Sequence, residues 1–284
     1  MDYNNEIVAK TKTALLQAGS TFLPDKKRAY ERAIETESNP QAKWTLETIL
    51  KNAEVAEKNC SPLCDDTGIP HILLEVGANA NVNGTVIASI KEGVRQGLRA
   101  LPGRPMAVKG NDAERLAQAI GLEEDSGALE PAPFSLREIT EDTLRLNVLM
   151  FGGGPAIRGK TYRVFHRHSV ENVLNEICDW ASEATALLGC TPCTLAIGIG
   201  RSHYEAASLM LQALVDGTYD HQTEMEQEIT NRVNSSGCGA LGLGGNTTVL
   251  STFLKVGPQR ASGVRVVCLR PCCCFEPRIA RVEL

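Results

Sequence analysis

The sequence lacks the features that would place the chain in a membrane or on nucleic acid. Its longest apolar runs fall far below the roughly 20 residues that a membrane-spanning helix needs. No basic run stands out and the formal net charge is -5, so we expect no nucleic-acid partner. The first residues, from Met1 to Glu6, have no basic segment followed by an apolar core, which predicts that no signal peptide is present. These absences favour a cytosolic protein.

Common catalytic and cofactor patterns are missing too. The five histidines form no Ser-His-Asp or Cys-His order, and His166 and His168 are predicted surface residues at a helix start. Gly198-x-Gly200 and the glycine-rich run from Gly237 to Gly245 lack the full dinucleotide-binding fingerprint, which includes an acidic residue about 20 positions on. We therefore do not expect dinucleotide binding.

Cysteine, by contrast, is abundant, at ten residues per chain. Structural disulfides are not expected in a reducing compartment, so these thiols serve as metal ligands, catalysts or buried apolar filling. Cys178 falls inside a helical pattern and is predicted to be a core residue. Most of the others form three well-separated groups: Cys60 with Cys64, Cys190 with Cys193, and Cys268 with Cys272-Cys273-Cys274.

Two metal chemistries remain open for these thiols. Cys190-x-x-Cys193 is half of a zinc pattern, but zinc sites usually use two such pairs, and adjacent cysteines chelate one tetrahedral ion poorly. Three separated groups suit an iron–sulfur cluster, which takes thiolates from distant loops. Three thiolates on a four-iron cluster leave one iron open to act as a Lewis acid, which fits removal of water from a hydroxy-dicarboxylate.

The first cysteine group leads into Cys64-Asp65-Asp66-Thr67-Gly68. Cys64 could be a soft metal ligand, and Asp66 could be an acid or base two residues away. Gly68 would let the backbone turn tightly enough to aim both at one point. The alternative is an ordinary loop between a helix and a strand that the aspartates merely cap.

Hydrophobic periodicity predicts helices and short strands without a regular βαβ alternation, which is typical of an α+β fold. Residues 110–133 are polar and predict an irregular loop insertion. Helices are expected over residues 4–17, around Leu46–Ala53, over 84–102 and 169–188, and after capping signatures at Ser202 and Thr223. Strands are expected over residues 71–76, 144–148, 194–198, 247–256 and 264–269.

Five motifs occur in a fixed order: Cys64 to Gly68, Gly152-Gly153-Gly154, Cys190-Thr191-Pro192 with Gly198-Ile199-Gly200, the Gly237–Gly245 run, and Cys274-x-x-x-Arg278. Together they resemble the iron–sulfur-dependent class I fumarase and L-tartrate dehydratase family, specifically its α subunit or N-terminal domain. The resemblance runs from about Trp44 to Arg278. It implies a single domain over residues 1–284, with a helical segment over 1–43 before the family-like region 44–284. Helices would pack around short mixed β-sheets.

The resemblance also implies chemistry. It implies a hydro-lyase that carries a [4Fe-4S] cluster and reversibly removes water from a hydroxy-dicarboxylic acid of the malate/fumarate or tartrate type. Cys64 and Cys190 match the first two cluster ligands. Cys274 is the preferred third, because the family's cysteine precedes an arginine by four positions, while Cys272 is a rival on its spacing from the preceding strand.

Further positions match the family's substrate site. Asp66 matches the carboxylate that partners the catalytic base, and Arg104 matches an arginine for a substrate carboxylate. Two glycine loops match those that line the site, and Gly153 and Gly154 of the first are predicted to bind substrate. The second comprises Gly242 to Gly245.

Two departures from the family pattern leave other interpretations open. Gln259, also predicted to bind substrate, stands where the family has a histidine, and Asp65 replaces a glutamine and adds negative charge near a dianionic substrate. The sequence ends at Leu284, before the family's β domain, so we expect a separate β subunit, in an (αβ)₂ assembly, to supply the catalytic base. The alternatives are a diverged paralogue with another hydroxy acid as substrate and a non-catalytic subunit that holds zinc or a cluster.

Overall fold

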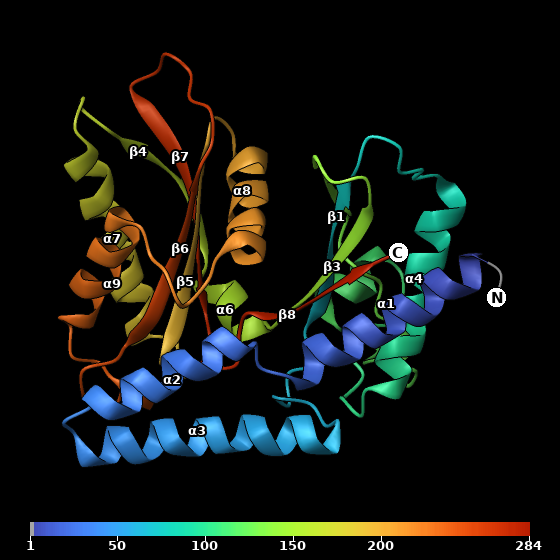
Figure 1. Ribbon diagram of the computed structural model, residues 1–284, viewed down its shortest axis with the longest axis horizontal. Coiled ribbons are helices and arrows are strands. Elements are labelled where there is room, and N and C mark those ends of the chain that lie inside the picture. Colours follow the sequence, from blue (N-terminus) through green and yellow to red (C-terminus); the bar gives the residue numbers. More distant parts are fainter. Residues whose placement is uncertain (1–2) are drawn as a thin grey trace. The chain divides into compact units, whose positions relative to one another are not determined.

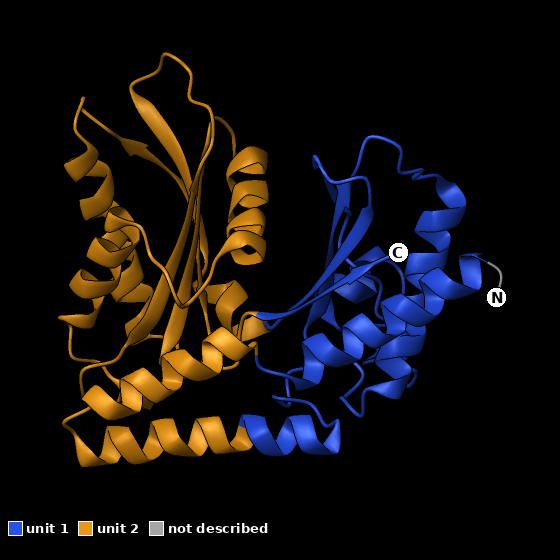
Figure 2. Ribbon diagram, viewed as in Figure 1, with its two compact units in different colours: residues 1–22, 53–152, 278–284 blue, residues 23–52, 153–277 orange. Residues whose placement is uncertain are grey.

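The computed structural model describes residues 3–284, and the chain divides into two compact units (Figure 2). Unit 1 combines the chain up to Phe22 with Ala53–Gly152 and Arg278–Leu284, and unit 2 combines Leu23–Asn52 with Gly153–Pro277. Each unit has its own four-stranded mixed sheet, which confirms the α+β class predicted from the sequence. The single domain over residues 1–284 stays a prediction.

In unit 1, the helices α1 (Tyr3–Ser20) and α4 (Gly84–Ala100) pack on one face of a sheet with the strand order β2-β1-β3-β8 (Figure 1). Ile72 and Leu74 of the central strand β1 are fully buried against these helices, while Glu75 points to the opposite face, as the period of a strand requires. The elements are α1 (Tyr3–Ser20), β1 (Ile69–Val76), α4 (Gly84–Ala100), α5 (Asp112–Ala117), η1 (Ser126–Ala128), β2 (Ser135–Glu138), β3 (Leu144–Phe151) and β8 (Arg278–Glu283).

Unit 2 has helices on both faces of a sheet with the order β4-β7-β5-β6 (Figure 1). The elements are α2 (Pro24–Thr36), α6 (Gly153–Arg158), β4 (Lys160–Phe165), α7 (Val170–Ala186), β5 (Cys193–Gly200), α8 (His203–Asp216), α9 (Glu224–Asn234), η2 (Ala240–Gly242), β6 (Val249–Val256) and β7 (Val264–Cys272). The helix α3 (Pro40–Asn59) begins in unit 2 and ends in unit 1.

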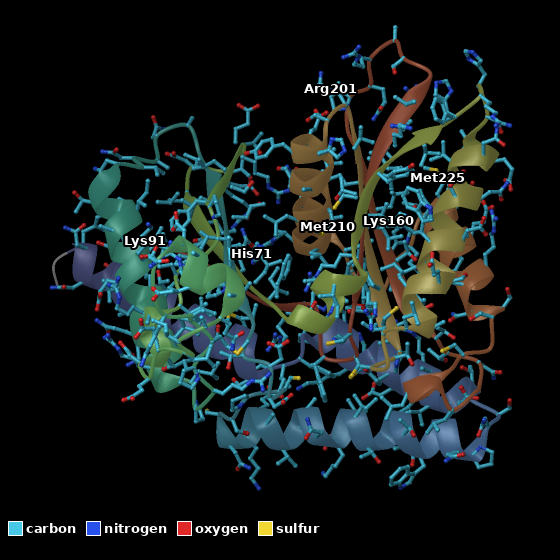
Figure 3. All side chains as sticks on the ribbon, turned by 180° about the vertical axis from the view of Figure 1, so that it is seen from behind. His71, Lys91, Lys160, Arg201, Met210 and Met225 are labelled. Atoms are coloured by element: carbon cyan, nitrogen blue, oxygen red, sulfur yellow. The ribbon has the colours of Figure 1, made fainter. Side chains whose placement is uncertain are left out.

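The two helical layers of unit 2 cover its sheet in different ways. α7 and α9 bury their apolar faces together with β5 and β7 in one cluster. On the other face, Met210 of α8 packs against a cluster that includes Val266 and Cys268 of β7 (Figure 3). α8 also approaches β5 closely at Gly198, where a Cβ atom would overlap the backbone of Ala206. Only glycine permits this contact.

The predicted helices and strands are present, with differences that have local causes. The loop expected over residues 110–133 contains α5, which a capping box between Asn111 and Glu114 begins. Gly153 starts the helix α6 rather than continuing an open glycine loop. Cys178 is a core residue, as predicted. None of the helices within residues 3–284 combines the length and apolar character needed to cross a membrane.

Candidate functional site

The Cys64–Gly68 loop of unit 1 lies between α3 and β1 and is fixed mainly through its backbone. Gly68 has a φ of +81°, which favours glycine, and its N–H donates to Asp66 Oδ1 at 3.1 Å. Buried Arg278 donates from Nη1 to the carbonyl oxygens of Asp66 at 2.8 Å and Thr67 at 3.2 Å. Arg278 closes the motif order in the sequence, and the structure gives it this bracing role.

The side chains of Cys64, Asp65 and Asp66 lie closer to solvent than the backbone anchors of this loop. Cys64 is half-buried, and its thiol contacts Asp65 Oδ1 at 3.5 Å. Asp65 also lies 3.8 Å from Arg104, and the two side chains are 85% and 56% exposed. Thr67 donates its hydroxyl to Arg104 O at 2.8 Å, which holds the backbone of the arginine beside the loop. Unit 1 thus brings together Cys64, Asp65, Asp66 and Arg104.

Unit 2 brings together the other two predicted ligands, Cys190 and Cys274. The Cys274 N–H donates to Cys190 O at 2.8 Å. The Cys274 thiol is buried, and hydrogen bonds with the Cys190 and Cys273 thiols, together with burial, raise its pKa well above the usual range. Cys190 is exposed, so the pair lies where a buried loop meets the surface of the unit.

Cys272, the rival third ligand, has different surroundings. It is the last residue of β7, pairs with Thr194 of β5 and is 0% exposed. Burial raises the pKa of the Cys272 thiol well above its usual range, and the thiol is hydrogen-bonded to Arg270. Arg270 in turn forms a buried ion pair with Glu276 at 2.9 Å. Cys272 is therefore a buried residue at the paired end of β7, whereas the Cys274 thiol contacts Cys190.

Two side chains of α2 hold the backbone of the segment 273–276, which we call the cysteine loop. Lys26 Nζ donates to Glu276 O at 2.7 Å and Tyr30 OH donates to Cys274 O at 2.8 Å. Both are 0% exposed. Burial lowers the pKa of Lys26 to about 8, although the neighbouring cysteine triplet and Glu276 act in the opposite direction. Sequence reasoning missed both residues. The available signal was the helical spacing of the buried positions of α2: Lys26, Ala29, Tyr30 and Ala33.

The glycine-rich run of unit 2 is tied to the Cys190 segment. Thr191 donates its hydroxyl to Gly239 O at 2.6 Å and accepts from Leu241 N at 3.0 Å through its carbonyl. At the other end of the run, Asn246 N donates to the buried Glu37 carboxylate at 2.8 Å. The loop after Cys190 and the glycine run are therefore held together by hydrogen bonds. The glycines of α6, Gly153 and Gly154, are exposed.

Gln259 is used locally. Its Nε2 group donates to Gly257 O at 3.0 Å and to Ile199 O at 3.3 Å, which ties the segment after β6 to the end of β5. Within residues 3–284, no three His, Cys, Asp or Glu side chains form a group that could hold a metal ion. Unit 1 carries Cys64, and unit 2 carries Cys190 and Cys274.

Comparison with known proteins places the chain in a family. A family model described as "Fumarate hydratase (Fumerase)" matches residues 8–283. The putative L(+)-tartrate dehydratase subunit alpha of Methanocaldococcus jannaschii is 29% identical over 282 residues, which cover 95% of each chain. The L(+)-tartrate dehydratase subunit alpha of Escherichia coli K12 is 25% identical over 94% of this chain and 86% of its own. The putative class I fumarate hydratase of Geobacillus stearothermophilus is 26% identical over 86% of this chain but 48% of its own.

The family match begins at residue 8, so it includes α2, which lies before the region in which the motifs carried the resemblance. The resemblance itself is confirmed. The chain belongs to the fumarate hydratase (Fumerase) family, whose members are hydro-lyases.

Proposed function

We propose that the chain is the α subunit of a [4Fe-4S]-dependent hydro-lyase that reversibly removes water from a hydroxy-dicarboxylic acid of the malate/fumarate or tartrate type. The contact between Cys190 and Cys274 carries this proposal. It is supported by relatives named as α subunits of L(+)-tartrate dehydratase that match nearly the whole chain.

The residues present fit such a cofactor. Iron–sulfur clusters take thiolate ligands, and unit 2 holds two thiols in contact on loops that buried side chains brace. Cys64 is the proposed third ligand, from unit 1. When bound by three thiolates, the cluster supplies one iron with an open position, which acts as a Lewis acid on the substrate hydroxyl.

We assign the third position to Cys274 rather than Cys272. Cys274 lies within hydrogen-bonding contact of Cys190, whereas Cys272 lies inside the β7–β5 pair against Arg270. Cys272 is the last residue of β7 and is paired with β5, whereas Cys274 lies beyond the end of the strand, so the two thiols are not interchangeable without moving the strand end.

The remaining site residues are proposed from their positions in the family pattern. Arg104 binds a substrate carboxylate, for which a guanidinium offers two parallel donors. Asp66, held by the Gly68 N–H, orients the catalytic base that the β subunit supplies. Gly153 and Gly154 let substrate approach the backbone closely. Gln259 contacts the substrate region in place of the family's histidine.

The proposed partner is a separate β subunit, in an (αβ)₂ heterotetramer. The names of the two tartrate dehydratase relatives support a second type of subunit. We propose a cytoplasmic location, because a cluster held by free thiols needs reducing surroundings.

A second candidate is a paralogue that acts on a different hydroxy acid. Two observations favour it: the Asp65 carboxylate lies 3.8 Å from Arg104, and the amide donors of Gln259 are used by backbone carbonyls. Activity of Gln259→His on fumarate and tartrate separates the candidates. A rise supports the malate/fumarate or tartrate substrate class, and no rise supports another substrate.

The proposal is tested by iron and acid-labile sulfide analysis of the anaerobically purified chain, with an EPR spectrum after mild oxidation. About four irons and four sulfides per chain, with a three-iron signal on oxidation, are expected for a cluster with one open iron. Zinc in their place, or no metal, would contradict it and leave a non-catalytic subunit of the family. A substrate screen with the β subunit then follows.

A further inference from the structure

The part of α2 nearest the cysteine loop bears two buried polar groups that both reach for the same short segment. Lys26 binds Glu276 O and Tyr30 binds Cys274 O, at 2.7 and 2.8 Å. The two carbonyl oxygens lie two residues apart and belong to the turn over residues 273–276, in which Glu276 N donates to Cys273 O. The shape of this turn is thus set by side chains from a distant part of the chain.

Lys26 is the unusual member of the pair. A fully buried lysine is costly unless other groups compensate its charge, and Lys26 is 0% exposed. One of its hydrogen bonds goes to the backbone carbonyl of Glu276 at 2.7 Å, and the Glu276 carboxylate accepts from Arg270 at 2.9 and 3.1 Å. A methionine would fill the same helix face without bringing a charge into the interior. The structure therefore places an ammonium group in the interior, on the segment that follows Cys274.

We propose that Lys26 is a positioning residue for the cysteine loop, which holds the Cys274 thiol in place for its cofactor and sets a positive charge beside the thiolates that bind it. The inference rests on the proposed function for the cofactor, but the positioning of the loop concerns the chain alone. Tyr30 shares the positioning and carries no charge. Lys26→Met, Lys26→Arg and Tyr30→Phe therefore separate the two contributions.

The first measurement concerns the full chain without metal. Cysteines are pulse-labelled with iodoacetamide and mapped by mass spectrometry. In Lys26→Met we expect Cys274 to label at least tenfold faster than in the unchanged chain, because its loop is released. Fully buried Cys193, in β5 of the same unit, should keep its slow labelling and report that the unit stays folded. Tyr30→Phe should show a smaller increase.

The second measurement follows reconstitution with ferrous iron and sulfide under anaerobic conditions. Lys26→Met should retain less than half of the iron, and the retained cluster should have a lower reduction potential, because a nearby positive charge favours the reduced form. Lys26→Arg should restore both values in large part. Lys27→Met, which removes a half-buried lysine from the same helix, is the matched control and should behave like the unchanged chain.

The outcomes are distinguishable from a failure of the proposed function. If the unchanged chain takes up no iron but Lys26→Met still exposes Cys274, the positioning role stands and the cluster proposal falls. If Cys274 labels at the same rate in a folded Lys26→Met, the inference is wrong whatever the iron content. If Lys26→Met does not fold, Lys26→Arg and Tyr30→Phe give the same comparison. In that case, faster labelling of Cys274 in Tyr30→Phe than in Lys26→Arg supports the inference, provided that the Lys26→Arg chain retains its iron. Loss of iron from the Lys26→Arg chain with unchanged labelling of Cys274 contradicts the inference.

Discussion

In unit 1, Cys64 lies in a loop whose charged side chains face solvent, whereas in unit 2, Cys274 lies in a loop whose polar contacts are buried. Asp65 of the first loop and Arg104 beside it are both more than half exposed, while Lys26 and Tyr30 beside the second are 0% exposed. The backbone of the first loop is braced by the buried side chain of Arg278, which follows it far along the chain. The second is braced by side chains of α2.

This difference teaches how one proposed site can combine rigidity with adaptability. Buried hydrogen bonds and charges are expensive to break, so they hold a ligand loop in one geometry. Exposed charge pairs are worth little, so they can exchange partners when a charged substrate arrives. We infer that unit 2 mainly fixes the cofactor ligands and unit 1 mainly adjusts to the substrate.

The sharpest test of the comparison replaces Cys274 and Cys272 of unit 2 by serine, one at a time. Cys274→Ser should abolish cluster binding and lower activity with the β subunit by more than the roughly 10–100-fold that loss of an outer partner of a metal costs. Cys272→Ser should keep its iron, because Cys272 is fully buried and paired with Thr194 of β5. Iron content and dehydratase rates check both variants. The reverse pattern would make Cys272 the ligand and break the assignment.

The stability of unit 1 should depend on pH through Glu75, which lies on the face of its sheet opposite the helices. Burial would raise the pKa of Glu75, but hydrogen bonds from Asn147 and Arg137, with the nearby arginine charges, outweigh it and lower the pKa below its ordinary value of 4.5. A lowered pKa means that the stabilisation is complete above pH 4.5 and is lost as the pH falls through the folded-state pKa.

Glu75→Gln should therefore lower the free energy of unfolding by roughly 2 kcal/mol at pH 7, because it leaves the partly buried Arg137 and Arg145 without their carboxylate. The difference from the unchanged chain should shrink as the pH falls below 4.5. Urea unfolding at several pH values measures it. A difference that stays constant down to pH 3 would show that the carboxylate charge does not stabilise unit 1.

The smallest expected effect concerns the exposed pair of unit 1. Asp65→Gln restores the residue of the family pattern and releases Arg104 for a substrate carboxylate, so KM should fall by up to about 5-fold with little change in kcat. Steady-state kinetics with the β subunit measures this. Asp112→Gln, which removes another exposed aspartate paired with an arginine in unit 1, is the control and should leave KM unchanged. A rise in KM on Asp65→Gln would mean that Asp65 helps to bind the substrate.

Local pattern predicted much of this fold, because long amphipathic helices and capping signatures are written in neighbouring residues. α3, α4 and α7 follow from their apolar spacing, and the capping box at Thr223 begins α9. α2 lies within the segment 1–43 that the resemblance gave as helical, but its own pattern did not predict its bounds, because its composition is strongly polar and one of its buried positions is a lysine. The edge strand β4 was missed because most of its side chains are exposed, so it shows no alternation.

The motif order predicted the family, but not how the cysteine loop is held. Spacing alone left Cys272 and Cys274 as rivals, since it could not show that β7 continues to Cys272. The bracing of the loop by α2 depends on contacts between residues far apart in the sequence, which no local pattern records.

These contacts join positions 250 and 244 residues apart, which has a consequence for the order of events in the cell. α2 is synthesised well before the loop that it holds, because its bonding residues precede that loop by 250 and 244 positions. Contacts of such long separation form late, because the intervening chain must first be brought together. The cysteine loop can therefore reach its final shape only once both segments have been synthesised, so any cofactor that needs this shape should be inserted after Glu276 has left the ribosome.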